Sequence, residues 1–361
     1  MHAFASIVVL LLAADPFSVG QRVMPKVGAK VRIGETLSDG AGMTMPWTVR
    51  QVDGQWLLID AERKAWAKAS DVIGVADAPS YYTEIIRGKR SAAAYHARAL
   101  AWMELDEYDK AIEDCTDSIR IDPKLTQVYV TRANSYNMKG DLPNALKDAN
   151  SAIALDSKSS SAFICRGNVW SQQGDTDRAI QDFSEAIILD PKSPLARVNR
   201  AVESYKKQDI DSAVADCEEA VRVAPTYIRA FQTLGYLQLL GLKQVAQAER
   251  SFLKAIQLDP NDTVSLNELA WLYATCPYPE TRNGKRAVEF ADRCCRLSNY
   301  SDPSLIDTLA AAYAERGDFD LAAEWQEKAM AINKAEDYQD EAGKRLALYR
   351  EKKPYHEVLR P

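Results

Sequence analysis

From residue 92 onward, small and apolar side chains follow a helical period that restarts every 34 residues up to the fifth unit, and after somewhat longer spacings in the last two units. Two positions of this period are occupied by small residues, as expected where two helices cross closely. The first reads Ala99, Ala133, Gly167, Ala201, Gly235, Ala270 and Ala310, and the second reads Ala111, Ala145, Ala179, Ala213, Ala248, Ala287 and Ala322. Turn and N-cap signals such as Gly140-Asp141 separate the two positions, and prolines such as Pro191 follow the second. The pattern predicts seven helix–turn–helix units that begin near residues 92, 126, 160, 194, 228, 263 and 303.

Residues 20–76 have a different pattern, with short alternating runs and no helical period. The runs are Lys30–Ile33, Thr48–Val52 and Trp56–Ile59. Asp53-Gly54 joins the last two runs and is a strong signal for a β-hairpin turn. This segment is therefore predicted to be a small β domain.

These patterns divide the chain into five parts. Residues 1–19 are a candidate signal peptide and leader, 20–76 the β domain, 77–91 a linker, 92–336 the helical repeats, and 337–361 a final helix and tail. Within the linker, Tyr81–Arg87 is expected to form a short helix. The final helix is expected to cover the exposed apolar face of the seventh unit with Leu346, Leu348 and Tyr349.

One unit in particular, residues 160–193, resembles the tetratricopeptide repeat (TPR). The residues that carry this resemblance are Phe163, Arg166, Gly167, Trp170, Gly174, Ala179, Phe183, Ala186 and Pro191. The segments Trp47-Thr48-Val49, Gly54-Gln55-Trp56-Leu57, Ala65-Trp66-Ala67 and Asp71-Val72-Ile73 resemble bacterial SH3-like domains, with Ala65 where those domains usually have glycine. These resemblances imply a mainly α protein: a right-handed TPR solenoid of about seven repeats with a capping helix, preceded by a small SH3-like β-barrel.

Two charged positions also recur at the 34-residue spacing. Their members are Arg98, Arg132, Arg166 and Arg200, and Asp114, Asp148, Asp182 and Asp216. In an antiparallel helix pair these positions come opposite each other, so we expect a structural Arg–Asp ladder. The alternative is a basic stripe that binds a ligand. Both series stop at the fifth unit, where Leu234 takes the place of arginine.

Composition narrows the range of functions. The net charge of −6 and the isoelectric point near 5.4 disfavour a nucleic-acid partner. Only His2, His96 and His356 are present, and the chain has neither a phosphate-binding loop nor a dinucleotide fingerprint. We therefore expect no enzymatic activity, no cofactor and no metal site.

Six cysteines leave the redox compartment open. Cys276, Cys294 and Cys295 share the sixth unit, and a disulfide from Cys276 to one of the other two is one alternative for an exported protein. The other is that all the cysteines are small apolar residues of the helix packing.

Phe4–Ala14 is an apolar run with the length of a signal-peptide core but too short to span a bilayer. It favours export to the periplasm or envelope of a bacterium. The alternative is a cytoplasmic protein with a mis-set start codon or a disordered N-terminus. No integral membrane span is expected.

Stacked TPRs offer a concave groove lined by the first helix of each unit. The carboxylate-clamp TPR domains, which hold chaperone C-termini, are similar in part: Asn168, Asn199 and Arg229 match three of their five positions, whereas Ile164 and Thr233 depart from them. Amide side chains suit the backbone of an extended peptide. Asn134, Asn168, Asn199 and Arg229 are the candidate peptide-binding residues, and the alternatives are other surfaces or no groove ligand.

These features favour a non-enzymatic scaffold or adaptor that binds a protein or peptide partner. The alternative is an envelope protein whose SH3-like domain binds peptidoglycan or a cell-wall peptide, with the TPRs as a spacer or self-assembly module. Trp47, Trp56 and Trp66 would form an aromatic groove in that case. The expectation we favour is that at least two of the three fill the core of the β domain.

Overall fold

The computed structural model describes residues 17–33, 36–39, 47–60, 64–241 and 243–357. Most of the candidate leader, including the apolar run Phe4–Ala14, lies outside the described residues. The chain divides into two compact units, residues 1–175 and 176–361.

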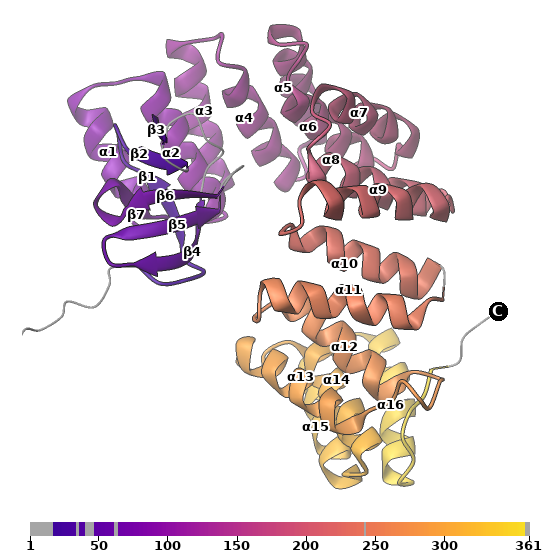
Figure 1. Cartoon of the computed structure of the whole chain (residues 1–361). Helices are drawn as coiled ribbons and strands as arrows, with labels where there is room; N and C mark the ends of the chain where they lie inside the picture. The colour runs from indigo at the N-terminus through magenta and orange to yellow at the C-terminus, as the bar shows by residue number, and fades with distance from the viewer. Residues whose placement is uncertain (1–16, 34–35, 40–46, 61–63, 242, 358–361) are drawn as a thin grey trace, which may run out of the picture. The chain divides into compact units, whose positions relative to one another are not determined.

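In its described residues, the first unit begins with the strands β1 to β7 and continues with the helices α1 to α6 (Figure 1). The strands are β1 Arg22–Pro25, β2 Lys30–Ile33, β3 Thr36–Asp39, β4 Trp47–Asp53, β5 Trp56–Asp60, β6 Lys64–Lys68 and β7 Val72–Gly74. The helices are α1 Ala78–Gly88, α2 Ala92–Glu104, α3 Tyr108–Ile121, α4 Thr126–Met138, α5 Leu142–Leu155 and α6 Ser160–Gln172.

The second unit is entirely helical in the part that the structure describes. Its helices are α7 Thr176–Leu189, α8 Pro194–Lys206, α9 Ile210–Val223, α10 Ile228–Tyr236, α11 Val245–Leu258, α12 Thr263–Thr275, α13 Gly284–Leu297, α14 Pro303–Arg316, α15 Phe319–Ile332 and α16 Glu336–Arg350. The helices pair along the chain as predicted, and the seven first helices begin at the seven predicted residues.

The small positions explain the close helix pairs. The alanines of the second small position are fully buried in every repeat, as Ala111 and Ala322 illustrate. The turns between paired helices use backbone conformations that glycine adopts without strain, with φ of +77° at Gly140 and +94° at Gly317. The fifth repeat has one additional residue, and there α10 continues as a π-helical turn over Leu237–Gly241.

The strands form one antiparallel sheet in the order β3-β2-β6-β5-β4-β1-β7. The predicted hairpin is confirmed, because β4 pairs with β5 across Gly54, whose φ is +55°. The core is built from Val23, Val31, Trp47, Val49, Leu57, Ile59, Ala65, Ala67 and Val72. Trp47 is fully buried, whereas Trp56 and Trp66 are only half-buried.

The expectation that at least two tryptophans fill the core is therefore wrong. Successive side chains of a strand point to opposite faces of the sheet. Leu57 of β5 and Ala65 and Ala67 of β6 point into the core, so Trp56 and Trp66 lie on the outer face.

The segment between the β domain and the first repeat contains α1, which is longer than the predicted Tyr81–Arg87 helix. Met24 of β1 packs in one buried cluster with Ala78 and Tyr82 of α1 and Ala97 of α2. The Tyr82 hydroxyl donates to the carbonyl of Pro25 at 2.5 Å. Helix α1 thus connects the sheet to the repeats through direct packing.

Candidate functional site

The predicted arginine and aspartate positions lie between paired helices. Arg132 of α4 donates to Asp148 of α5 through Nε at 2.6 Å and Nη2 at 2.8 Å. The pairs Arg98–Asp114 and Arg200–Asp216 have the same two-pronged geometry. The aspartate side chains are 5–8% exposed, so these ion pairs are largely removed from water.

Three of the arginines also donate to the preceding repeat, and Arg98 donates to Thr83 of α1 at 2.7 Å. Arg132 Nη1 donates to Thr116 Oγ1 at 3.0 Å, and Arg200 Nη1 donates to Ser184 Oγ at 3.0 Å. Arg166 Nη1 donates to Asn150 Oδ1 in the same way, at 2.9 Å. Arg132 and Arg200 therefore each join three helices, because their guanidinium groups donate both to the paired aspartate and to the preceding repeat.

Asp182, the remaining aspartate of the series, is buried on α7. The hydrogen bonds that Arg98 and Arg200 donate to the carboxylates of Asp114 and Asp216 raise the pKa of these two arginines. These arginines are therefore charged at pH 7. The position is suited to holding repeats together and not to releasing a proton.

Several polar side chains of the first unit lie close together on the first helices α4 and α6. Gln127 of α4 donates to Ser161 of α6 at 3.2 Å, and these residues are 34 positions apart. Asn134 and Asn168, also 34 apart, are half-buried on the same two helices. Helices α4 and α6 pack directly through a cluster that includes Ala133 and Cys165. The structure thus places the first two candidate residues on neighbouring helices.

His96 of α2 lies next to this surface and hydrogen-bonds Thr131 Oγ1 at 2.9 Å. Burial lowers the pKa of His96 to about 4, because a charged imidazolium would lose its hydration there. The imidazole is therefore neutral at pH 7 and extends the uncharged polar surface by another residue.

The other two candidate residues lie in the second unit. Arg229 is exposed on α10, where it can meet a ligand. Asn199 is 8% exposed, so little of its surface is open to a peptide. The four candidates thus fall into two pairs, one in each compact unit, and burial sets Asn199 apart from the rest.

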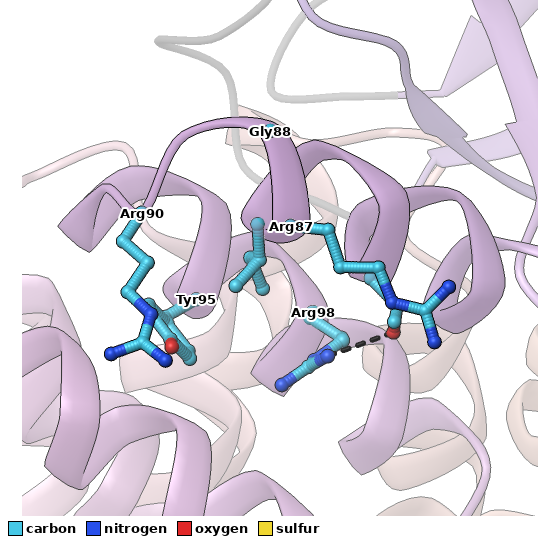
Figure 2. Close-up of a pocket in the computed structure, with 7 residues that line it drawn as sticks. Arg87, Gly88, Arg90, Tyr95 and Arg98 are labelled. Atoms are coloured by element: carbon cyan, nitrogen blue, oxygen red, sulfur yellow. Dashed lines mark hydrogen bonds between the residues drawn. The ribbon is translucent and has the colours of Figure 1, made fainter.

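An open pocket of about 560 Å³ lies where α1 meets α2 (Figure 2). Its lining residues are Thr83, Ile86, Arg87, Gly88, Arg90, Tyr95 and Arg98. Two of the arginines are already engaged. Arg87 donates to Glu84 at 2.5 Å, and Arg98 donates to Thr83 at 2.7 Å, the dashed line in Figure 2, as well as to its ladder aspartate. Two of the three arginines that line the pocket therefore make hydrogen bonds within the protein.

The outer face of the β sheet brings aromatic and basic side chains together. Trp66 pairs with Arg32 of β2 and with Leu58 of β5, while Trp56 pairs with Lys68 of β6. The Arg32 guanidinium lies 4.7 Å from the centre of the Trp56 ring, and the Lys68 ammonium lies 5.6 Å from it. We call Arg32, Trp56, Leu58, Trp66 and Lys68 the outer β face.

All six cysteines are buried free thiols, so the Cys276 disulfide to Cys294 or Cys295 is not formed. Burial raises the pKa of Cys294 to about 11 and that of Cys295 to about 12. Within the described ranges, no three His, Cys, Asp or Glu side chains are placed to hold a metal ion. None of the helices in the described part of the chain has the length and apolar character needed to cross a membrane.

Comparison with known proteins agrees with this architecture. Models of the tetratricopeptide repeat family match residues 92–125, 166–228, 228–262 and 304–336. A search of curated proteins gives no match.

Solved structures share the fold at low sequence identity. The Cut9–Hcn1 hetero-tetramer of the APC/C matches with a TM-score of 0.59 and 16% identity, covering 75% of this chain and 52% of that chain. Yeast Tom70 matches with a TM-score of 0.56 and 18% identity, covering 76% of this chain and 58% of its own. Pseudomonas aeruginosa PilF matches with a TM-score of 0.52 and 19% identity, covering 61% of this chain and 97% of its own. The chain spans only about half of the Cut9–Hcn1 chain that it matches.

Consecutive helix pairs that recur along the chain at about 34 residues define an α-helical repeat protein. The matched segments fall on those pairs, with the capping helix α16 after the last of them. The chain is a tetratricopeptide repeat protein, and its N-terminal sheet is consistent with an SH3-like domain. Repeats of this family are typically non-catalytic modules for protein–protein interaction.

Proposed function

We propose that this protein is a non-enzymatic scaffold that binds an extended peptide of a partner protein across α4 and α6. The observation that carries the proposal is the row of half-exposed amide and hydroxyl groups on these helices, with Asn134 and Asn168 one repeat apart. An amide can donate to a peptide carbonyl and accept from a peptide N–H at the same time. Two such groups on rigid helices would hold the backbone of a partner peptide by hydrogen bonds, whatever the charge of its side chains.

The Arg–Asp ladder supports this assignment, because it argues against the alternative of a basic stripe that binds a ligand. Arg132 is bonded to Asp148 and Thr116, so its charge is not directed at a ligand. An uncharged surface therefore remains for recognition.

The proposal predicts that replacing both Asn134 and Asn168 by alanine weakens peptide binding by about tenfold or more, since each lost hydrogen bond costs about 1 kcal/mol. The probe is a set of peptides selected from a random phage library on the wild-type full-length chain. Fluorescence anisotropy then gives Kd for wild type and variant.

The matched control is Asn144→Ala, which removes an exposed amide from α5 in the same unit. It should leave Kd within twofold of wild type. If the selected peptides bind the double variant as tightly as wild type, the α4–α6 surface is not the binding site.

We also propose a second function, in which the outer β face binds peptidoglycan. Sugar rings stack on tryptophan, and the acidic groups of peptidoglycan stem peptides suit Arg32 and Lys68. Residues 20–76 hold eight Lys and Arg against six Asp and Glu, a net charge of +2, although the whole chain carries −6. This function goes with export to the periplasm or envelope, which N-terminal sequencing of the mature protein would test.

The second proposal predicts that full-length wild type sediments with purified sacculi and that Trp56→Ala combined with Trp66→Ala lowers the bound fraction at least fivefold. Val27→Ala is the control, because Val27 is a 66% exposed apolar residue of the same domain. Wild type that stays in the supernatant, or an unaffected double variant, would leave this function without support.

A further inference from the structure

The segment after α16 turns back to α12, as the yellow trace at the end of the chain shows (Figure 1). We call residues Lys353–Glu357 the tail. The backbone N–H of Glu357 donates to the carbonyl of Thr275, the last residue of α12, at 2.8 Å. The Trp271 indole N–H donates to the Glu357 carboxylate at 2.7 Å. The tail therefore makes both a backbone contact and a side-chain contact with the same helix.

The two preceding tail residues have specific partners as well. The Tyr355 ring lies 6.1 Å from the Trp271 ring and 5.8 Å from the Arg345 guanidinium, measured to ring centres. His356 Nε2 lies 2.7 Å from a Glu315 carboxylate oxygen at the end of α14. Tyr355 thus lies against an aromatic ring and a guanidinium, His356 against a carboxylate, and Glu357 against an indole donor.

The receiving surface is held rigid by buried contacts that do not involve the tail. Arg345 of α16 donates to Asp307 of α14 at 3.0 Å, and both side chains are about one-tenth exposed. Gln326 also donates to Asp307. Glu315 is fixed from the other side by Arg282, whose Nε donates to it at 3.0 Å. We call Trp271, Thr275, Glu315 and Arg345 the tail site.

The cap on the seventh repeat is formed by helix α16, and Tyr355 of the tail packs against the same cluster as Tyr349. Helix α16 already covers the seventh repeat with buried Ala342, Leu346 and Tyr349. Tyr355 and His356, by contrast, are only half-buried, and Glu357 is exposed. Contacts that are sequence-specific yet partly open to water are typical of a reversibly bound peptide.

Trp271 is the ninth residue of the sixth repeat, the same repeat position that Asn134 and Asn168 occupy. We propose that the tail site is a second peptide-binding site, for extended peptides that carry an aromatic, a basic and an acidic residue in that order. The tail occupies this site within the same chain and competes with an external partner for it.

This inference does not rest on the α4–α6 surface. The tail site lies wholly in the second unit and shares no residue with Asn134 or Asn168. Failure of one proposal therefore leaves the other intact.

The test uses a fluorescent peptide with the sequence of residues Lys352–Glu357 and two full-length proteins, wild type and Tyr355→Ala/Glu357→Ala. A tethered tail acts at an effective concentration of the order of millimolar, so the wild-type site is mostly filled. We expect the peptide to bind the double variant at least tenfold more tightly than wild type. The control peptide has alanine in place of its tyrosine and glutamate and should bind neither protein.

Two results would overturn the inference: no binding of the natural peptide to the double variant, or equal binding to both proteins. Hydrogen exchange on wild type gives a second test that does not depend on how the variant folds. Unlabelled peptide at about 10 mM should speed exchange of the Glu357 amide as it displaces the tail. Unchanged exchange would show that the tail is a fixed part of the structure.

Discussion

Arg132→Ala is expected to lower the free energy of unfolding of the first unit by about 3–5 kcal/mol. The substitution leaves the Asp148 side chain, which is 5% exposed, without its two guanidinium hydrogen bonds. It also removes the donor to Thr116, so the second repeat loses a contact with the first. Chemical denaturation followed by circular dichroism measures the loss, and hydrogen exchange should locate it in α4 and α5.

The chain itself suggests how to recover part of this stability. In the fifth repeat the same two positions hold Leu234 and Ser251, an uncharged pair. Combining Arg132→Leu with Asp148→Ser should therefore be less damaging than Arg132→Ala, because no buried charge remains unpaired. Arg120→Ala is the control. Its salt bridge to Asp117 is exposed, so the change should stay within about 0.5 kcal/mol. A loss that small for Arg132→Ala would contradict the structural role of the ladder.

The helical part of the fold could be predicted almost to the residue because the 34-residue period is redundant. Each repeat restates the same small positions, so one unusual residue does not obscure the frame. The sequence did not predict the additional hydrogen bonds of Arg132, Arg166 and Arg200 to the preceding repeat. Their acceptors also recur at 34 residues, as Thr116, Asn150 and Ser184. They differ in chemical type, so the shared ability to accept a hydrogen bond is the only signal they carry.

The candidate site was harder to predict, because exposure depends on neighbours that the repeat pattern does not specify. Asn199 has the residue type of a peptide-binding amide but is buried on α8. Strand alternation could have placed Trp56 and Trp66 opposite the core, had Leu57 and Ala67 been used to set the inward face. The register of the strands is a better guide to which tryptophans are buried than the small size of the domain.

The tail site had no signal in the repeat pattern. Its members come from the sixth repeat, the seventh repeat and the capping helix, at unrelated spacings. Tyr355, His356 and Glu357 follow the last helix and belong to no period. Only the fold brings them to Trp271, which is why the site emerged from the contacts.

Gly284→Ala is expected to destabilise the second unit by about 2–3 kcal/mol. A β-carbon on Gly284 would lie 2.5 Å from the backbone nitrogen of Arg316 and 2.7 Å from the carbonyl carbon of Glu315. These are backbone atoms, so the end of α14 must move away from α13 to admit a methyl group. Glu315 would move with it, and its contacts to Arg282 and His356 would lengthen. The variant should therefore show both a lower unfolding free energy and faster amide exchange in the tail.

The matched control is Gly343→Ala in α16, where an added β-carbon meets no atom within 4 Å. There the usual advantage of alanine over glycine inside a helix should stabilise the chain by about 0.5–1 kcal/mol. Opposite signs for two identical substitutions in the same unit would isolate the close approach of α13 to α14 as the cause. Equal effects would mean that a β-carbon at residue 284 lies farther than 2.5 Å from the Arg316 nitrogen. The position of Glu315 would then not depend on a glycine at residue 284.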